Sequence, residues 1–196
     1  MTTSLIYVVG ASGSGKDSLM RYGRERLADV PGVLFAHRYI TRRAHAGDEN
    51  HVSLSVQEFA ARDKAGLFAM HWNSHGHQYG IGIEINQWLA KGIAVVMNGS
   101  REYLDEARRA YPEILPVWID VSPEILQERL RLRARESESD IAARLVRHQC
   151  MSRTVRDGII ITNDGPLAEA GEALVAAIIQ KTAQKTTQQT NQILCA

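Results

Sequence analysis

The chain has 196 residues, of which 44% are hydrophobic and 23% charged, and its formal net charge is +1. This composition is ordinary for a globular protein and supports one sizeable core with a small inserted subdomain. The balanced charge gives no reason to expect a nucleic-acid or membrane partner, and the apolar runs are far shorter than the roughly 18 residues of a membrane helix.

Two features favour a cytoplasmic location. The N-terminus MTTSLIYVVG lacks the charged segment, long apolar stretch and cleavage site of a secretory signal. Cys150 and Cys195 lie far apart and make neither a disulfide framework nor a metal-binding cluster, which suits a reduced compartment. We therefore expect a cytoplasmic protein, and the sequence leaves open whether it forms a homodimer.

Short apolar strands alternate with helical segments along the chain. Residues 5–9 form a β-branched apolar run that ends at Gly10, which is typical of a buried parallel strand. The elements predicted after it are helix 16–28, strand 33–40, helices 56–65 and 83–91, strand 93–97, helix 102–111, strand 115–121, helices 122–135 and 141–156, strand 158–162 and helix 167–180. This alternation predicts an α/β fold with a parallel sheet flanked by helices.

Three segments fall outside that pattern. Residues 42–50 are polar and loop-like, whereas residues 66–82 are dense in Gly, His and aromatic residues and suggest a binding surface. The stretch from residue 181 onward is rich in Thr and Gln and lacks apolar periodicity, so we expect a mobile polar tail.

The segment after the first strand carries the sequence's most specific motif. Gly10, Ala11, Ser12, Gly13, Ser14, Gly15 and Lys16 match G-x-x-x-x-G-K between a predicted strand and a predicted helix. Glycines allow backbone N–H groups to turn around phosphate oxygens, and the helix N-terminus adds positive potential. Lys16 supplies a charge for the β- and γ-phosphates. The motif predicts nucleoside triphosphate binding.

One position of this motif is unusual. Ser or Thr normally follows the lysine and binds Mg²⁺, but here Asp17 stands at that place and Ser18 follows. A carboxylate is a good Mg²⁺ ligand, so we predict a metal role for Asp17 and Ser18. The alternative is that Asp17 is only a favourable acid in the first helical turn.

With these motifs in place, the chain resembles the guanylate kinase family of P-loop nucleoside monophosphate kinases over most of its length. The matching segments are residues 10–16 (G-P-S-G-x-G-K in the family), Thr41, Arg42 and Gly47 (T-T-R-x-x-R-x-G-E), residues 66–68 and 76–80 (G-x-F-L-E and G-N-x-Y-G), residues 129–145 (the lid) and residues 159–163 (a late strand ending in Asn). The resemblance implies one kinase domain over residues 1–185, with an acceptor-binding insertion at about 37–92, a lid at about 131–144 and the tail at 186–196.

The departures from the family concern acceptor recognition. Met70 replaces the Glu that reads guanine, and Asn98 replaces an acid at the end of the family's third strand. A methionine cannot accept the hydrogen bonds that guanine offers. Arg38 replaces a serine and His45 replaces an arginine. The basic residues near position 40 suit an acceptor rich in phosphate, the alternative being a solvated basic loop.

The segments G-K-D-S, R-Y-I-T-R, H-G-x-x-Y-G-I and V-V-M-N-G-S-R resemble one subgroup, the ribose 1,5-bisphosphate phosphokinases of phosphonate degradation. This resemblance implies ATP and Mg²⁺ as co-substrate and cofactor, a sugar phosphate as acceptor, and 5-phospho-α-D-ribose 1-diphosphate as product. The alternatives are a guanylate or other nucleoside monophosphate kinase, a sugar kinase of the gluconate or shikimate type, and a non-catalytic guanylate-kinase-like interaction module.

The resemblance also implies roles for single residues. Lys16 and the lid arginines Arg133 and Arg144 are the catalytic candidates, and Asn163 is expected near the adenine. For the acceptor we expect Arg38, Arg42, Tyr79 and His75, although Tyr79 could equally be a core residue. His71, His75 and His77 prompt a zinc interpretation, which the lack of Cys or nearby carboxylates disfavours.

Overall fold

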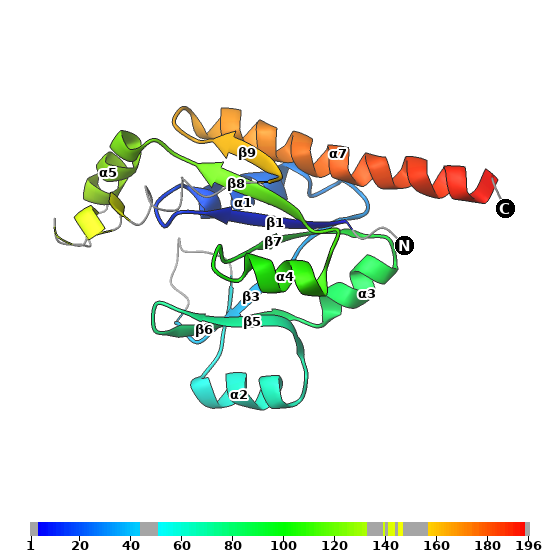
Figure 1. The fold of residues 1–196 in the computed structure, drawn as a ribbon, viewed down its shortest axis with the longest axis horizontal. Helices are drawn as coiled ribbons and strands as arrows, with labels where there is room; N and C mark the ends of the chain where they lie inside the picture. The colour runs from blue at the N-terminus through cyan, green and yellow to red at the C-terminus, as the bar shows by residue number, and fades with distance from the viewer. Residues whose placement is uncertain are drawn as a thin grey trace.

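The computed structural model describes residues 4–43, 51–132, 139, 141–143, 145–146 and 157–194. Its larger sheet contains β1 (Leu5–Gly10), β2 (Val33–Phe35), β7 (Ala94–Asn98), β8 (Leu115–Asp120) and β9 (Ile159–Thr162). The strands run in the order β2-β7-β1-β8-β9, and every pair is parallel. Helices lie on both faces of this sheet (Figure 1). The predicted α/β class with a flanked parallel sheet is confirmed.

Alternation along β1 explains why both faces are covered. Successive side chains of a strand point to opposite faces, so Ile6 and Val8 face one layer while Tyr7 and Val9 face the other. The first layer holds α1 (Lys16–Arg26) and α7 (Leu167–Leu194), which pack against each other; the second holds α3 (Glu84–Ala90) and α4 (Leu104–Ala110). Helix α5 (Pro123–Leu132) follows β8 at the end of the molecule where the glycine-rich loop lies (Figure 1).

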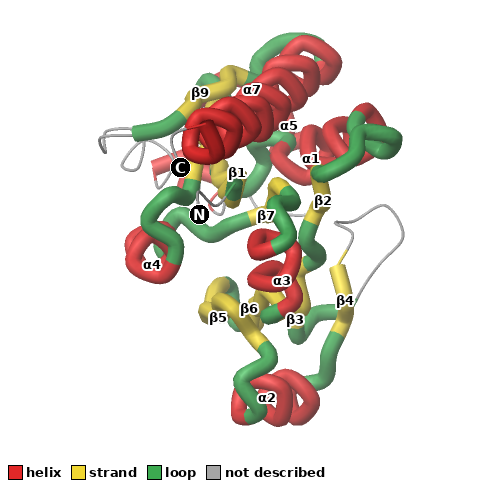
Figure 2. The backbone as a smooth tube through the Cα atoms, turned by 90° about the vertical axis from the view of Figure 1, so that its right-hand side faces the viewer, coloured by secondary structure: helices red, strands yellow, loops and turns green. Residues whose placement is uncertain are grey.

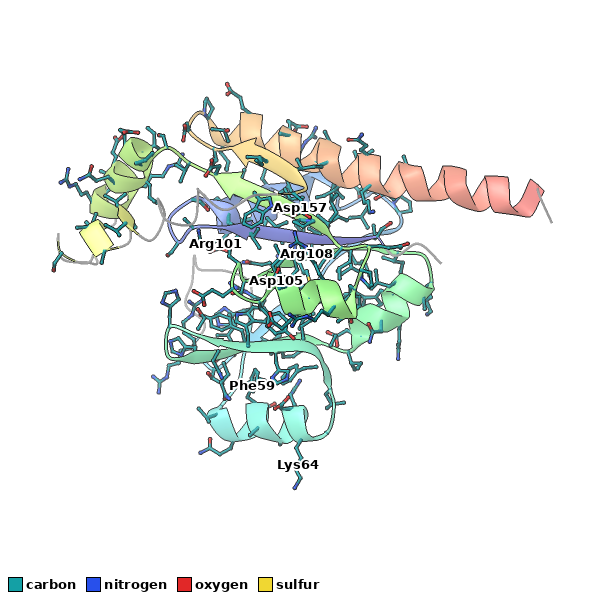
Figure 3. The ribbon with its side chains drawn as sticks, in the orientation of Figure 1. Phe59, Lys64, Arg101, Asp105, Arg108 and Asp157 are labelled. Atoms are coloured by element: carbon teal, nitrogen blue, oxygen red, sulfur yellow. The ribbon has the colours of Figure 1, made fainter. Side chains whose placement is uncertain are left out.

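A smaller, mixed sheet lies beside the α3/α4 layer. It comprises β3 (Arg38–Ile40), β4 (His51–Ser53), β5 (Phe68–Ser74) and β6 (His77–Gly82), in the order β4-β3-β6-β5. Its outer side carries α2 (Val56–Lys64), whose Phe59 stacks on Phe68 with ring centroids 4.6 Å apart. Figure 3 shows Phe59 directed toward the sheet and Lys64 directed away from it. Figure 2 shows α3 between the two sheets.

One apolar cluster joins the two sheets. It includes Tyr7 and Met97 from the larger sheet and Met70, Tyr79 and Ile81 from the smaller one, all of them buried. Burying apolar side chains stabilises their arrangement by roughly 1.5–3 kcal/mol for each large residue. The smaller sheet is therefore held in a fixed position against the larger one.

The structure corrects two predictions about strands. Residues 33–40 do not form one strand, because β2 belongs to the larger sheet and β3 to the smaller one. Ala36 still donates its N–H to Val96 of β7, and the chain then leaves that sheet. Strands β4, β5 and β6 were not predicted. Strand β4 has three residues, too few to show a period, and a polar stretch precedes it, while the residues of the β5–β6 hairpin were interpreted only as a binding surface.

The end of the last helix was also predicted wrongly. Helix α7 continues to Leu194 rather than ending at Gln180, and it extends past the sheet (Figure 1). Ala, Gln and Lys are good helix formers, and lengthening an existing helix needs no new nucleus, so an apolar face is not required for it to continue. The mobility of residues 186–196 and the domain limits stay predictions. Most of the predicted helix 141–156 lies outside the described residues.

Candidate active site

The glycine-rich loop occupies the carboxyl end of β1, the central strand. From β1 the sheet grows in opposite directions, with β7 on one side and β8 on the other. Ligands of open α/β sheets bind at such a switch point, outside the carboxyl ends of the strands. Residues 10–16 lead from β1 directly into α1, so their backbone N–H groups lie at a helix N-terminus that attracts phosphate.

Asn163 holds the backbone of the glycine-rich loop in place through a hydrogen bond. It follows β9, is only 3% exposed, and its Nδ2 donates a hydrogen bond of 2.7 Å to the carbonyl oxygen of Ser14. Gly15 has φ +83°, and a Cβ there would approach Asn163 Nδ2 to 2.4 Å, so only glycine fits. The structure thus places Asn163 against the loop backbone, and its predicted contact with adenine is untested.

Lys16 and Asp17 meet Asn98 at the carboxyl end of β7. Lys16 Nζ donates to Asn98 Oδ1 at 2.6 Å, and Asn98 Nδ2 donates to Asp17 Oδ1 at 2.9 Å. Asn98 is 4% exposed, and the β1–β7 register places it beside Val8. In the sequence, Asn98 stood out only as a lost acid, and its contact with the two site residues was not predicted. Its position at the end of a predicted strand was the one feature of the sequence from which a contact with the loop could have been inferred.

Asp17 carries a stable negative charge. Desolvation raises the pKa of its carboxyl, but the charges of Lys16 and Arg38 and hydrogen bonds from Lys16 and Asn98 outweigh that effect. The net pKa lies below the usual value, so the carboxylate is ionised at neutral pH. The Asp17 side chain is 53% exposed, which leaves it accessible to a cation. Ser18 lies next to it on α1 and is half-buried.

Arg38 reaches the same place from the smaller sheet. Its charge acts on both Asp17 and the Tyr7 hydroxyl, and its guanidinium lies 5.2 Å from the centroid of the Tyr79 ring. Tyr79 in turn stacks on Trp72, with centroids 5.7 Å apart and the rings 4° from parallel. Tyr79 is 7% exposed and belongs to the shared apolar cluster, so its ring packs in the core and supports Arg38. Its contact with the acceptor stays a prediction.

The backbone around Arg42 is held by hydrogen bonds from the smaller sheet. Its carbonyl oxygen lies 3.1 Å from His51 Nε2 and accepts a 2.8 Å bond from Ser53 Oγ. His77 Nδ1 lies 3.1 Å from the carbonyl oxygen of Thr41. These contacts fix the position of the half-buried Arg42 at the end of β3, beyond Arg38. They give His77 a structural role.

His75 has a turn conformation that explains its presence. It has φ +48° and precedes Gly76 with φ +74°, while Ser74 pairs with His77 across the β5–β6 hairpin. Two consecutive residues with positive φ make the two-residue turn whose twist suits a hairpin, and His adopts that region more readily than most residues. Its predicted contact with the acceptor is untested. Within the described parts of the chain, no three His, Cys, Asp or Glu residues gather as a metal site would require.

Two buried polar atoms point to a ligand beside the loop. Ser14 Oγ and Arg129 Nη1 have no hydrogen-bond partner. Arg129 comes from α5, and its Nη1 would be 3.7 Å from a Cβ at Gly15. A buried guanidinium nitrogen without a partner is costly, and an anion at the loop would satisfy it. The predicted lid arginines Arg133 and Arg144 lie outside the described residues.

Tyr7 and the residues after Asn98 were also missed by sequence reasoning. The Tyr7 hydroxyl donates to the carbonyl of Ser100 at 2.9 Å and accepts from its N–H at 3.0 Å. Burial raises the pKa of Tyr7 and keeps it protonated. This contact fixes the turn that leads from Asn98 to Arg101. Figure 3 shows Arg101 between β1 and the β5–β6 hairpin.

A P-loop, an arginine from a second sheet and a stacked aromatic pair beneath it define the class of the protein, a P-loop kinase of the nucleoside monophosphate kinase type. Among solved structures the chain is similar to guanylate kinase from Anaplasma phagocytophilum, with TM-score 0.67, 16% identity and 92% and 87% of the two chains covered. It is also similar to a gluconokinase from Sinorhizobium meliloti, with TM-score 0.52, 19% identity and 95% and 98% covered. These structural similarities show that the chain shares its fold with these kinases.

The sequences of curated proteins show the family. The chain is 58% identical over 181 residues to "Ribose 1,5-bisphosphate phosphokinase PhnN" of Thiobacillus denitrificans, covering 92% of this chain and 95% of that protein. It is 54% identical over 180 residues to the protein of that name from Desulfomicrobium baculatum, covering 92% and 96%. The chain belongs to the ribose 1,5-bisphosphate phosphokinase family. A scan against protein-family models finds no match. Across the described residues, no helix is long and apolar enough to cross a membrane.

We expect Asn163→Asp to weaken ATP binding at least about tenfold, because it replaces the donor to the Ser14 carbonyl with an oxygen at 2.7 Å. Calorimetric titration with ATP measures the effect. Asn86→Asp is the matched control, since the Asn86 side-chain oxygen accepts from Tyr111 at an exposed place and an aspartate can do the same. Unchanged ATP affinity in Asn163→Asp would contradict the role of Asn163 in shaping the loop.

We expect Met70→Glu to destabilise the protein and to yield no useful turnover of GMP. Met70 is 1% exposed within the shared apolar cluster, so a carboxylate there loses its hydration without gaining a partner. The expected loss is about 3 kcal/mol or more, and Met70→Leu, which keeps the volume, should lose less than about 1.5 kcal/mol. Urea unfolding measures both variants. Strong GMP turnover by Met70→Glu would show that position 70 faces the acceptor.

Proposed function

We propose that this protein transfers the γ-phosphoryl group of ATP to the 1-phosphate of ribose 1,5-bisphosphate, forming 5-phospho-α-D-ribose 1-diphosphate and ADP. One observation carries the proposal: two positive residues act on the Asp17 carboxylate. Lys16 comes from the nucleotide-binding loop and donates a hydrogen bond to Asp17, and Arg38 comes from the smaller sheet and lowers the pKa of Asp17 through its charge. The names of relatives at 54–58% identity support the same substrate.

Charge balance at the site suits this acceptor better than a nucleoside monophosphate. The base-reading acid of guanylate kinases is replaced by Met70, which is buried in apolar surroundings, and a second acid is replaced by the neutral Asn98. Arg38 adds a positive charge near Asp17. A sugar bisphosphate brings no base to be read and an additional phosphate to be neutralised, so both changes favour it.

The reaction needs alignment more than proton transfer. An oxygen of the acceptor 1-phosphate, already ionised near neutral pH, forms a bond to the γ-phosphorus, while the bond to the oxygen bridging the β-phosphate breaks and ADP leaves. We assign the loop backbone of residues 10–16 and Lys16 to the donor phosphates, and Arg38 and Arg42 to the acceptor phosphates. Arg133 and Arg144 are assigned, by the family resemblance, to the lid that covers the transferring group and excludes water.

Asp17 and Ser18 are the residues that would hold Mg²⁺. The fit rests on the chemistry of these donors, because hard cations prefer oxygen ligands and the ionised Asp17 carboxylate is accessible. When bound, the ion neutralises charge on the donor phosphates. Lys16, Arg38 and Arg129 would supply the protein's own positive charge around the same groups.

Purified protein with Mg·ATP should release ADP when ribose 1,5-bisphosphate is present, and much less with GMP or with no acceptor. Coupled detection of ADP, together with phosphorus NMR of the diphosphate product, measures this directly. Turnover with GMP at a comparable rate would mean that the replacements at Met70 and Asn98 are tolerated in a guanylate kinase. Hydrolysis of ATP without acceptor, at an equal rate in all three reactions, would contradict the proposed transfer.

Arg38→Met should raise the KM for ribose 1,5-bisphosphate by about 10- to 100-fold, since a hydrogen bond to a charged group contributes roughly 1.5–3 kcal/mol. The KM for ATP should change much less. Initial-rate kinetics with each substrate varied in turn separate the two effects. Arg43→Met is the matched control, because Arg43 is exposed and has no assigned contact. An unchanged acceptor KM in Arg38→Met would remove Arg38 from the acceptor site.

A further inference from the structure

Two positions of the phosphate site differ from the usual P-loop arrangement, because the acid and the neutral polar residue have changed places. P-loop enzymes hold their cation with a hydroxyl directly after the loop lysine and with an aspartate from a neighbouring strand. Here the residue after the lysine is the acid, Asp17, and the residue at the end of the neighbouring strand β7 is the neutral Asn98. The carboxylate has moved across the site, from the strand to the helix.

The geometry shows that the two positions still form one unit. Asn98 Nδ2 lies 2.9 Å from Asp17 Oδ1, so the amide and the carboxylate are joined directly. The opposite end of the same amide, Oδ1, accepts from Lys16 Nζ at 2.6 Å. Lys16 Nζ also lies 3.5 Å from Asp17 Oδ1. The three side chains therefore close a triangle across α1 and β7.

An amide is the group that suits position 98. Asn98 donates to the Asp17 carboxylate on one side and accepts from Lys16 on the other, and a carboxylate at position 98 could not donate to Asp17. Asn98 is 4% exposed and is fixed at the end of β7, which makes it a rigid spacer between its two partners.

We propose that Asp17 and Asn98 jointly form the cation-binding side of the phosphate site, Asp17 as the ligand and Asn98 as the positioning residue that aims both Asp17 and Lys16. The inference rests on the proposed function only in that the protein binds Mg·ATP. A consequence distinguishes it from a merely structural contact. The site needs one carboxylate and one amide, so exchanging the two should preserve it.

The test compares Asp17→Asn, Asn98→Asp and the exchange variant D17N/N98D with the unchanged protein. The readout is the factor by which Mg²⁺ tightens ATP binding, measured by calorimetric titration with and without the ion and with no acceptor present. Asp17→Asn should lose about tenfold or more of this factor, as expected for removing a charged ligand. Asn98→Asp should also lose part of this factor, because an aspartate at position 98 cannot donate the hydrogen bond that positions Asp17. The exchange variant should recover to within about threefold of the unchanged protein, which is strong non-additivity.

Two results would overturn the proposal. One is an Asp17→Asn variant with the full effect of Mg²⁺ on ATP binding. The other is an exchange variant whose loss equals the sum of the two single losses. Asn86→Asp controls for the addition of an acid at an exposed place. Thermal unfolding of each variant reports folding, and D17S/N98D, which has the usual P-loop arrangement, serves as a second exchange if D17N/N98D does not fold.

The same proteins separate this inference from the assignment of the acceptor. ATP binding with its Mg²⁺ dependence requires no acceptor, whereas turnover with ribose 1,5-bisphosphate requires both. Recovery of Mg²⁺-dependent binding without any turnover by the unchanged protein would uphold the Asp17–Asn98 unit and contradict the proposed substrate. Turnover of ribose 1,5-bisphosphate by the unchanged protein, without recovery of Mg²⁺-dependent ATP binding in the exchange variant, would support the proposed substrate and contradict the Asp17–Asn98 unit.

Discussion

The apolar cluster shared by the two sheets is the constraint on which the site depends. Donor and acceptor groups come from different sheets, Lys16 from the helix after β1 and Arg38 from β3, and they can cooperate only if the sheets keep a fixed distance. Tyr7 and Met97 on one side and Tyr79 and Ile81 on the other are buried together and provide that fixity. Close-packed interiors transmit displacement, so a change in this cluster would move Arg38 relative to the loop.

Several side chains serve packing and the site together. Tyr7 belongs to the shared cluster through its ring, while its hydroxyl fixes the turn at Ser100. Tyr79 contributes its ring to the cluster and supports the guanidinium of Arg38. Asn163 follows β9 and holds the loop backbone through its amide. The site is therefore preorganised by groups that the fold itself requires, which limits the reorganisation that binding must include.

The part of this arrangement that could be predicted is the part encoded by local patterns. The apolar run of β1, the glycine loop and the helix after it are contiguous in sequence, so the nucleotide side was predicted from residues 5–28, and the fold class was predicted from the alternation of short strands with helices along the chain. The contact of Asn98 with Lys16 joins positions 82 residues apart, and no local pattern specifies it. The break between β2 and β3 was missed for a related reason, because strand-forming residues stand at both ends of 33–40 and only tertiary pairing assigns them to two sheets.

His75 shows that residue type and backbone conformation carry different information. Its imidazole predicts ligand binding, which stays a prediction, and its positive φ accounts for its place in a hairpin turn. Met70 is a different case, because a methionine cannot accept the hydrogen bonds that guanine offers. By the resemblance to guanylate kinases it stands where that family has a base-reading acid, and it is buried with the aromatic residues of the smaller sheet.

The charge of the residues around the acceptor determines which class of acceptor this fold can bind. Relative to the guanylate kinase pattern, Met70 and Asn98 each remove an acid and Arg38 adds a base, whereas Asp17 adds an acid and His45 removes a base, so the local charge becomes more positive by one unit. Charges beside the acceptor act on it far more strongly than the net charge of the whole chain, which is only +1. A nucleoside monophosphate brings a single phosphate to this more positive site, and the removed acids would no longer bind its base. An acceptor with two phosphates and no base satisfies both conditions, so the electrostatics and the lost hydrogen bonds lead to the same class of substrate.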